Sequence, residues 1–337
     1  MAKTDRQASI APSEAPALAS LPRVPIDEVM RIFLTKPGFL LNRIDQIANA
    51  LYGRLAEGSE TLAQAEILLA IAAGQGRDQV GLARLCGIDT STTAIILDNL
   101  EVAGLVAREQ DPRDRRRSLP VLTSRGEARL PSVQAAFSKL QTELLAGMDE
   151  ARREAFVTLI SRIVAGGDNG APRWEEGDSP FAAQPSFLCR RALQICLAQF
   201  AACVAPLAIT LRQFSALVIL SLHPGLSQVE FARVFGLDPS TCAIVLKKLA
   251  TRGLLEAVRA AEDRRKTLYF TTEAGREQLA QVQPAADRSA ARTLAPLGPE
   301  EFARLLPMLQ AIVRRHAARL RYPGCLPWTQ EQCHETA

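Results

Sequence analysis

Two short stretches of the sequence concentrate positive charge in the same pattern. Residues 111–126 read DPRDRRRSLPVLTSRG, and residues 260–275 read AAEDRRKTLYFTTEAG. Arginine and lysine attract phosphate groups, and arginine suits the narrow, electronegative minor groove of DNA. A run of charge alone is usually a solvated surface, so its meaning depends on the elements that carry it. The candidate groove-binding side chains are Arg113, Arg115, Arg116, Arg117, Arg264, Arg265 and Lys266.

The two stretches belong to one long internal repeat. A shift of 149 positions aligns residues 61–134 with 210–283 without a gap, with roughly 28 identities in 74 positions. Further upstream, PGFLLNRIDQI at 37–47 matches PSFLCRRALQI at 185–195 with one residue of slippage. The chain therefore consists of two copies of one domain.

The repeat predicts how the chain divides. The segment between the copies is rich in Gly, Pro and acidic residues, which is typical of a linker. The N-terminus is rich in Ala, Pro and Ser, which favours a disordered tail. The predicted boundaries are a tail at 1–25, a first winged-helix unit at 26–165, a linker at 166–184, a second unit at 185–320 and a C-terminal tail at 321–337.

Each copy has the pattern of a helix-turn-helix that is followed by a β-hairpin. In the first copy Thr61 can cap one helix, a short helix lies within DQVGLARLCG, and Asp89 can cap another helix that Gly104 closes. Two short strands then enclose the arginine-rich stretch. Apolar spacing predicts a long helix before this lobe and two helices after it, at about 123–147 and 149–165. The predicted fold is therefore mainly α with small β-wings: two winged helix-turn-helix domains whose long terminal helices form an intramolecular pseudo-dimer.

Taken in order and found twice, these motifs resemble the MarR-type transcriptional regulators. The shared residues are Asp89, Ser91 and Thr92 at the start of the recognition helix, Gly104-Leu105 before the hairpin, Asp111 to Arg116 in the wing, and Leu122, Thr123 and Gly126 after it. The resemblance implies DNA binding, with Arg115 and Arg264 as the arginines that enter the groove. Members of this family are usually homodimers of one such unit. The fused chain is therefore expected to present two recognition helices to successive major grooves, roughly 34–36 Å apart.

The two recognition helices differ on their outward faces. A helical wheel places Ile96, Leu97 and Leu100, and their counterparts Val245, Leu246 and Leu249, toward the core. The second helix presents Lys247 and Lys248 where the first has Asp98 and Asn99, so phosphate-driven affinity should depend more on the second half. For Ile95 and Ile244 two interpretations stay open, packing beneath the wing or contact with thymine methyl groups. The predicted DNA-binding residues on these helices are Thr90, Ser91, Thr92, Ile95, Asn99, Ser240, Thr241, Ile244, Lys247 and Lys248.

The same resemblance implies a small anionic or phenolic effector beneath the winged lobe. The candidate anchors are Arg43, Gln46, Tyr52, Arg191, Gln194 and Phe200. The alternative is that the repeated Arg and Gln residues form inter-repeat hydrogen bonds or lie on the surface. Cys189, Cys196 and Cys203 share one helix face and are either a row of small buried residues or a redox sensor.

Composition and missing motifs exclude several function classes. The net charge of +4 and the pI of about 8.8 are compatible with nucleic acid. The longest apolar runs fall short of the roughly 18 residues that span a bilayer, and no signal-peptide core is evident, so we expect a cytoplasmic protein without a membrane partner. We find no zinc spacing, phosphate loop or nucleophile motif, and we expect no metal, no cofactor and no enzymatic activity.

These observations predict a DNA-binding transcriptional regulator that represses from a pseudo-palindromic operator and is released by a small molecule. Its expected partners are double-stranded DNA and that effector, and a higher oligomer is compatible with the sequence but not required. The alternatives are a ligand- or protein-binding module of the same fold that has lost DNA binding, and a redox-sensing regulator. The binding module stays an alternative because the first recognition helix is acidic.

Overall fold

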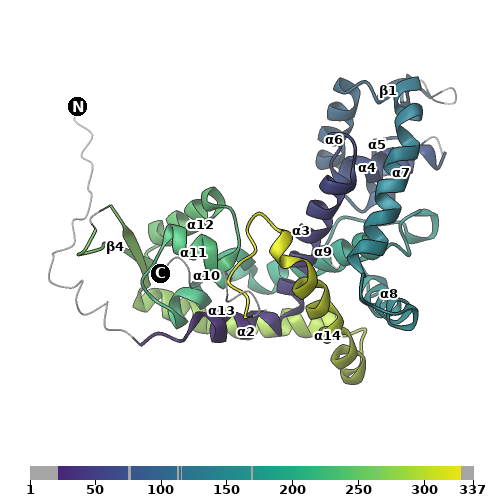
Figure 1. Ribbon diagram of the computed structural model, residues 1–337. Coiled ribbons are helices and arrows are strands. Elements are labelled where there is room, and N and C mark those ends of the chain that lie inside the picture. The colour runs from purple at the N-terminus through teal and green to yellow at the C-terminus, as the bar shows by residue number, and fades with distance from the viewer. Residues whose placement is uncertain are drawn as a thin grey trace, which may run out of the picture. The chain divides into compact units, whose positions relative to one another are not determined.

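The chain folds into two compact units that cut across the sequence repeats. The computed structural model describes residues 22–74, 77–111, 114, 116–167, 170–263 and 265–327 (Figure 1). The larger unit comprises residues 33–205 and 285–321, and the smaller unit comprises residues 1–32, 206–284 and 322–337. The larger unit therefore holds the first winged lobe together with helices of both repeats, whereas the smaller unit holds the second winged lobe.

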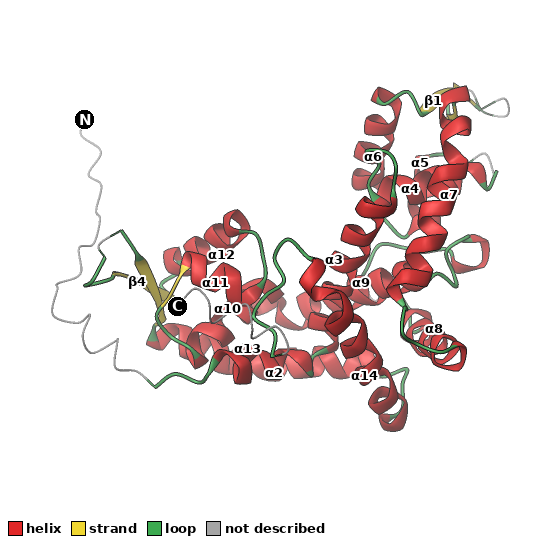
Figure 2. Cartoon of the chain, viewed as in Figure 1, coloured by secondary structure: helices red, strands yellow, loops and turns green. Residues whose placement is uncertain are grey.

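Helices make up most of the larger unit (Figure 2). Its elements are α3 (Pro37–Leu55), α4 (Leu62–Ala72), α5 (Gln79–Cys86), α6 (Thr90–Val102), β1 (Val106–Gln110), β2 (Ser118–Leu122), α7 (Ser124–Leu144), α8 (Glu150–Ala165), η1 (Glu176–Asp178), α9 (Pro185–Val204), α14 (Pro299–His316) and η3 (Ala317–Arg319). The short helix η2 (Ala205–Leu207) begins in the larger unit and ends in the smaller one. The predicted caps are confirmed, because Thr61 forms a capping box with Gln64 and Asp89 caps α6.

The smaller unit contains the second winged lobe. Its elements are α10 (Leu211–Leu222), β3 (Leu226–Ser227), α11 (Gln228–Phe235), α12 (Pro239–Thr251), β4 (Leu255–Arg259) and β5 (Thr267–Thr271), while α2 (Ile26–Leu34) and α13 (Glu273–Leu294) pass from one unit to the other. Both predicted wing hairpins are present, since β1 pairs antiparallel with β2 and β4 with β5. The short strand β3 adds a third strand to the second wing, in the order β3-β5-β4, and was not predicted.

Helices from both repeats share the core of the larger unit. Helix α3 of the first repeat packs against α9 and α14 of the second, and α8 also packs against α9. The side chains of Leu40 and Ile44 on α3 and of Leu188 and Ala192 on α9 are buried there. This shared core is the body of the predicted intramolecular pseudo-dimer.

Helix α9 is part of a longer apolar stretch than the apolar runs of the sequence indicated. Together with η2 it forms a stretch, Pro185–Leu207, that is long and apolar enough by composition to cross a membrane. Most of that stretch is buried inside the protein, and it carries Arg190 and Arg191. The core helix of a soluble protein has the same properties, and the packing of α9 against α3 and α8 accounts for its composition.

The segments outside the repeats also take part in the two units. In the linker, Phe181 is 1% exposed and stacks on Phe187 with ring centroids 5.2 Å apart. Of the tail predicted at 1–25, residues 1–21 lie outside the described residues. The Val24 N–H donates to the Leu222 carbonyl in the smaller unit. The assignment of the residues at 166–184, at 321–337 and at both repeat boundaries stays a prediction.

Candidate nucleic-acid interface

The first helix-turn-helix is formed by α5 and α6, which meet at 108°. Gly87 ends α5 with φ of +56°, in the left-handed region that favours glycine. Asp89 then caps α6 by accepting hydrogen bonds from the Thr92 N–H at 2.8 Å and the Thr92 hydroxyl at 2.6 Å. The hydrogen bond from the Thr92 hydroxyl, and secondly the one from the Thr92 N–H, lower the pKa of Asp89. The slight burial of Asp89 opposes this shift. The turn is therefore stabilised at both ends by local sequence.

The outward face of α6 combines an exposed isoleucine with two carboxylates that share one arginine. Ile95 is 62% exposed, so it does not pack beneath the wing in this structure. Asp98 accepts a hydrogen bond from Arg108 of β1 at 2.5 Å, and Arg108 also lies 3.5 Å from Glu101. Thr90, Ser91, Thr92 and Asn99 are exposed on the same helix, while Ile96, Leu97 and Leu100 are buried as predicted.

The second recognition helix, α12, presents a more basic surface. Asp238 caps it by accepting the N–H groups of Ser240 and Thr241, and the hydroxyl of Ser240 together with these bonds lowers the pKa of Asp238. Lys247 and Lys248 are exposed, and Ile244 is 56% exposed. A hollow of about 480 Å³ runs along this face, lined by Ala208, Gln213, Ile244, Lys247, Lys248, Thr251 and Arg252. Ser240 is exposed and Thr241 is half-buried.

The first wing is held by hydrogen bonds of Asp114 and of Arg117. The Asp114 carboxylate accepts the backbone N–H of Arg116. Arg117 donates to Asp78, the N-cap of α5, at 2.6 Å, which ties the wing to the helix-turn-helix. The hydrogen bond with Asp78 raises the pKa of Arg117 above its ordinary value. Arg116 is exposed, while Arg113 and Arg115 lie outside the described residues.

The second wing repeats the turn of the first. The Asp263 carboxylate accepts the backbone N–H of Arg265 at 2.9 Å, as Asp114 does for Arg116. The Arg265 and Lys266 side chains are exposed. Arg264 lies outside the described residues, and its contact with DNA stays a prediction.

The predicted effector residues Arg43 and Arg191 are buried in the same way in their helices. Arg43 donates to Gln46 at 2.9 Å, and Arg191 donates to Gln194 at 2.6 Å. Arg191 also donates to the carbonyl of Pro172 at 2.9 Å, and Gln194 donates to the carbonyl of Gly87 at 3.0 Å. The hydrogen bond between Gln194 and Gly87 joins the second repeat to the first. The pair Arg191 and Gln194 therefore fits the alternative interpretation, in which these residues form inter-repeat hydrogen bonds. Burial lowers the pKa of Arg43 to about 10, which leaves it charged near neutral pH.

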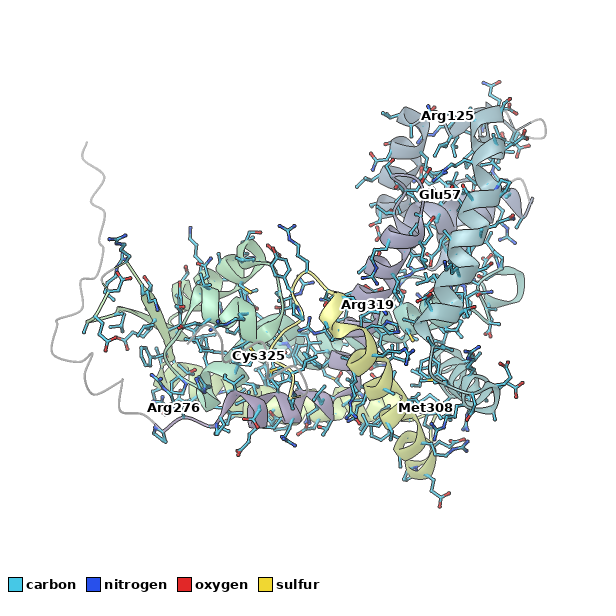
Figure 3. All side chains as sticks on the ribbon, in the orientation of Figure 1. Glu57, Arg125, Arg276, Met308, Arg319 and Cys325 are labelled. Carbon is cyan, nitrogen blue, oxygen red and sulfur yellow. The ribbon has the colours of Figure 1, made fainter. Side chains whose placement is uncertain are left out.

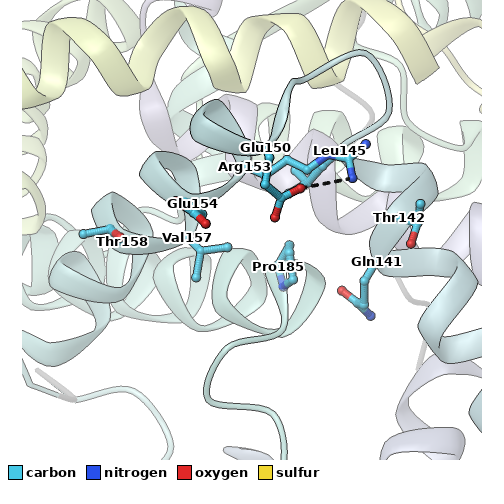
Figure 4. A pocket seen from close by; sticks show the side chains of 9 residues that line it. All are labelled: Gln141, Thr142, Leu145, Glu150, Arg153, Glu154, Val157, Thr158 and Pro185. Carbon is cyan, nitrogen blue, oxygen red and sulfur yellow. Dashed lines mark ion pairs between the residues drawn. The ribbon is translucent and has the colours of Figure 1, made fainter.

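Tyr52 and Phe200 are also buried. Burial, and secondly the charge of Glu60, raise the pKa of Tyr52 to about 12, against a smaller opposing effect of Arg129. A separate groove of about 550 Å³ lies between α7, α8 and the start of α9 (Figure 4). The predicted effector residues do not line it. Its lining residues are Gln141, Thr142, Leu145, Glu150, Arg153, Glu154, Val157, Thr158 and Pro185.

The three cysteines of α9 have different surroundings. Cys189 is fully buried, and burial followed by the charge of Asp45 raises the pKa of its thiol. Burial raises the pKa of Cys196 to about 11, which opposes formation of the reactive thiolate. Cys203 is half-buried and lies 3.5 Å from an Arg292 nitrogen. The row of small buried residues therefore describes Cys189, whereas Cys196 and Cys203 are both half-buried.

Several residues near this interface were missed. Val80 and Val229, which occupy equivalent places in the two repeats, are exposed near the starts of α5 and α11. The sequence signal for these two valines is the repeated pattern QVxxAR, which stands at 79–84 and at 228–233. Glu66 and Arg190 form an ion pair at 2.6 Å in which the Glu66 side chain is fully buried. No local motif could have paired these residues, because they lie 124 positions apart.

A model of the MarR family matches residues 61–117 and again residues 209–266. Each match spans one helix-turn-helix and most of one wing. The two matches fall at equivalent positions of the sequence repeat, so they support the tandem arrangement independently of our alignment.

Several solved structures of transcriptional regulators are similar to this chain in sequence. The transcriptional repressor CouR, bound to a 23-mer DNA duplex, is 34% identical and is matched over 89% of its length and 37% of this chain, with a TM-score of 0.36. PcaV from Streptomyces coelicolor, in complex with its natural ligand, is 31% identical over 93% of its length and 39% of this chain, with a TM-score of 0.37. BpsR from Bordetella bronchiseptica, whose DNA binding is regulated by 6-hydroxynicotinic acid, is 29% identical over 94% of its length and 39% of this chain, with a TM-score of 0.37.

Proposed function

This chain belongs to the MarR family of transcriptional regulators and carries the family's domain twice, and on that premise we propose that one chain binds one operator with two unequal half-sites. A helix-turn-helix dimer obtains its second recognition helix by symmetry, whereas this chain obtains it by duplication. Covalent linkage makes the second docking event intramolecular. It also allows the two halves to differ, so the operator need only be pseudo-palindromic.

The single observation that carries this proposal is the difference in charge between the recognition helices. On α12, Lys247 and Lys248 are exposed beside Ile244. On α6 the equivalent positions are Asp98, which is paired with Arg108, and Asn99. Phosphate neutralisation by lysine strengthens binding to any duplex, so the second repeat should supply more of the affinity.

Base reading is assigned to the exposed isoleucines and the polar residues at the helix starts. Ile95 and Ile244 present aliphatic surface beside Ser91 and Ser240, and thymine is the base that offers a methyl group in the major groove. The wings then supply the basic side chains for the minor groove. Within the described residues these are Arg116, Arg265 and Lys266, and the sequence adds Arg113, Arg115 and Arg264.

The proposed regulator is a cytoplasmic repressor that a small anionic or aromatic molecule releases from DNA. DNA binding by BpsR is regulated by 6-hydroxynicotinic acid, and a CouR structure contains p-coumaroyl-CoA, which supports a ligand of this class for the present chain. Arg43, Gln46, Tyr52, Arg191, Gln194 and Phe200 are the proposed contacts. A buried, charged arginine favours an anionic group on the ligand.

A salt titration with a matched pair of variants tests the DNA proposal. A duplex is first selected by the wild-type protein from a random library, and its affinity is measured by fluorescence anisotropy between 50 and 200 mM salt. Lys247→Ala with Lys248→Ala should lower the slope of log K against log salt by about 2, because each lost phosphate contact removes about 0.9. Lys139→Ala on the exposed face of α7 is the control and should leave the slope unchanged.

Stoichiometry tests the single-chain model directly. Native mass spectrometry of the selected complex should give one chain per duplex. Two chains per duplex would refute the pseudo-dimer model, and an unchanged slope in the lysine variant would refute the role of α12. Addition of 6-hydroxynicotinate or another aromatic acid to the same complex then tests release.

A second candidate is a ligand- or protein-binding module of the same fold with weakened DNA binding. The acidic Asp98 and Glu101 on the outward face of α6 favour it. Alanine at Arg116, Arg265 and Lys266 separates the two candidates. If affinity for the selected duplex at physiological salt is unchanged in that variant, the wings do not bind DNA and the second candidate is preferred.

A further inference from the structure

The carbonyl end of α5 is capped from outside the winged lobe. The last carbonyls of a helix have no partner within the helix and need one elsewhere. The Glu175 N–H donates to the carbonyl of Arg84 at 3.1 Å. The carbonyl of Leu85 accepts two hydrogen bonds, from the Trp174 indole N–H at 3.2 Å and from the Ser179 hydroxyl at 2.9 Å. All three donors belong to the linker.

Helix α9 satisfies the next two carbonyls. Arg190 donates to the carbonyl of Cys86 at 3.1 Å, and Gln194 donates to the carbonyl of Gly87 at 3.0 Å. Four consecutive carbonyls, at the point where α5 turns toward the recognition helix, are therefore held by the linker and by the second repeat.

The linker segment 172–181 is itself firmly anchored in the larger unit. Phe181 stacks on Phe187 and meets Phe137 edge-on, with centroids 5.8 Å apart. The Trp174 ring lies 5.3 Å from that of Phe187. The Glu175 carboxylate accepts hydrogen bonds from Arg77 at 2.9 Å and from Arg84 at 3.3 Å, at the two ends of α5. The segment thus joins α5 to the helices α7 and α9.

A second segment makes the equivalent contact in the smaller unit. The Cys325 N–H donates to the carbonyl of Val234 in α11 at 3.2 Å, and Val234 is the repeat counterpart of Leu85. Figure 3 labels Cys325 among the side chains of the chain. Leu326 beside it is buried. Both segments come after the last α-helix of their repeat. In sequence, both stretches begin with an arginine and an aromatic residue and end with a proline and an aromatic residue. These are RWEEGDSPF at 173–181 and RYPGCLPW at 321–328.

We propose that residues 172–181 and 322–327 are paired positioning segments, each of which holds the first helix of a helix-turn-helix at its carbonyl end and so sets the orientation of the recognition helix that follows. The inference rests on the proposed DNA-binding function. Only the turn from Gly87 to Asp89 separates α5 from α6, so a rotation of the end of α5 moves the start of α6. Ser91 and Thr92, which face outward there, would then lose their alignment with the bases.

There is no room for this end of α5 to adjust freely. A Cβ placed on Gly87 would lie 2.8 Å from Cδ of Arg191, so the turn fits closely against α9. Trp174, Ser179 and Glu175 are positioning residues in this scheme, because none of them is assigned a contact with DNA.

Half-site affinities test the proposal. Trp174→Phe with Ser179→Ala removes both donors to Leu85 and keeps an aromatic ring against Phe187. Two duplexes are derived from the selected operator by scrambling either half-site, and the Lys247→Ala, Lys248→Ala variant identifies which half-site the second repeat reads. The double variant should bind the first-repeat half-site about tenfold more weakly, a loss of about 1.4 kcal/mol, and the other half-site unchanged. Cys325→Pro, which removes the N–H donor to Val234, should give the reciprocal result.

Hydrogen exchange provides the readout that distinguishes positioning from general destabilisation. Backbone amides of residues 84–92 should exchange faster in the Trp174→Phe, Ser179→Ala variant, while those of α3 and α9 stay as in the wild type. Equal loss at both half-sites, or unchanged affinity at both, would overturn the proposal. Failure of the wild-type protein to select any duplex would instead overturn the proposed DNA-binding function.

Discussion

The buried carboxylate of Glu66 predicts a stability that depends on pH. Glu66 lies on α4 with a fully buried side chain, and its titratable and charged neighbours are Arg190 on α9, Asp45 on α3 and the Cys86 thiol on α5. Burial raises the pKa of Glu66, the charge of Arg190 opposes the rise and the charge of Asp45 adds to it, so that the pKa lies at about 7. Burial also raises the pKa of Asp45. The cluster therefore holds two carboxyl groups and one guanidinium group.

The direction of the effect follows from the raised pKa. The folded protein binds the Glu66 proton more tightly than the unfolded chain does, so this contribution to stability is fully present below pH 4.5. It is lost as the pH rises through about 7. A rise of the pKa from 4.5 to about 7 corresponds to about 3 kcal/mol between the two protonation states.

Glu66→Gln isolates this contribution. The amide keeps the shape of the side chain and can still accept a hydrogen bond from Arg190, but it does not titrate. The free energy of opening of α4 is measured by hydrogen exchange at increasing urea, from pH 4.5 to pH 8. Relative to the variant, the wild-type protein should lose about 3 kcal/mol over this range.

Helix α10 provides an internal control, because Ser215 stands at the position equivalent to Glu66. Its opening should not respond to the substitution. If the difference between the wild-type protein and the variant at α4 stays constant with pH, Glu66 titrates as an ordinary surface carboxylate and the reasoning from burial is wrong.

Two further predictions concern packing and thiol access. Gly126→Ala should destabilise the first winged lobe by about 2 kcal/mol or more in thermal unfolding, because a Cβ there would lie 2.1 Å from the carbonyl oxygen of Leu105. Gly53→Ala, near the C-terminal end of α3, meets nothing within 4 Å and should be neutral or stabilising by up to about 1 kcal/mol. Mass-spectrometric alkylation should modify Cys203 in the native state and Cys189 only after unfolding, because the Cys189 thiol is buried with a raised pKa. Rapid native labelling of Cys189 would restore the redox interpretation for that residue.

The elements that position the interface were predictable because their signals are local. Thr61 and Asp89 each cap a helix within three residues along the chain, and the spacing of Ile96, Leu97 and Leu100 places them on one buried face. The wing hairpins follow from adjacent strands. The third wing strand β3, of two residues, is too short to produce a recognisable alternating pattern.

The partners of individual side chains were less predictable. The exposure of Ile95 decides against packing beneath the wing, and the wheel alone could not do so because both interpretations place the residue outward. Arg117 was grouped with the groove-binding arginines, yet it is hydrogen-bonded to Asp78, 39 positions earlier in the chain. The carboxylate of the wing aspartate Asp114 accepts the backbone N–H of Arg116, two positions further along the chain.

The sequence by itself determined that the chain is a duplicated winged-helix protein, because helix caps, apolar spacing and the 149-residue repeat are all properties of short stretches or of their recurrence. Only the tertiary structure decided that α9 of the second repeat and the linker hold the end of α5 in the first. Such contacts depend on how surfaces about 100 residues apart meet, and each of the donors Trp174, Ser179 and Arg190 would look like an ordinary polar residue in its own stretch of sequence.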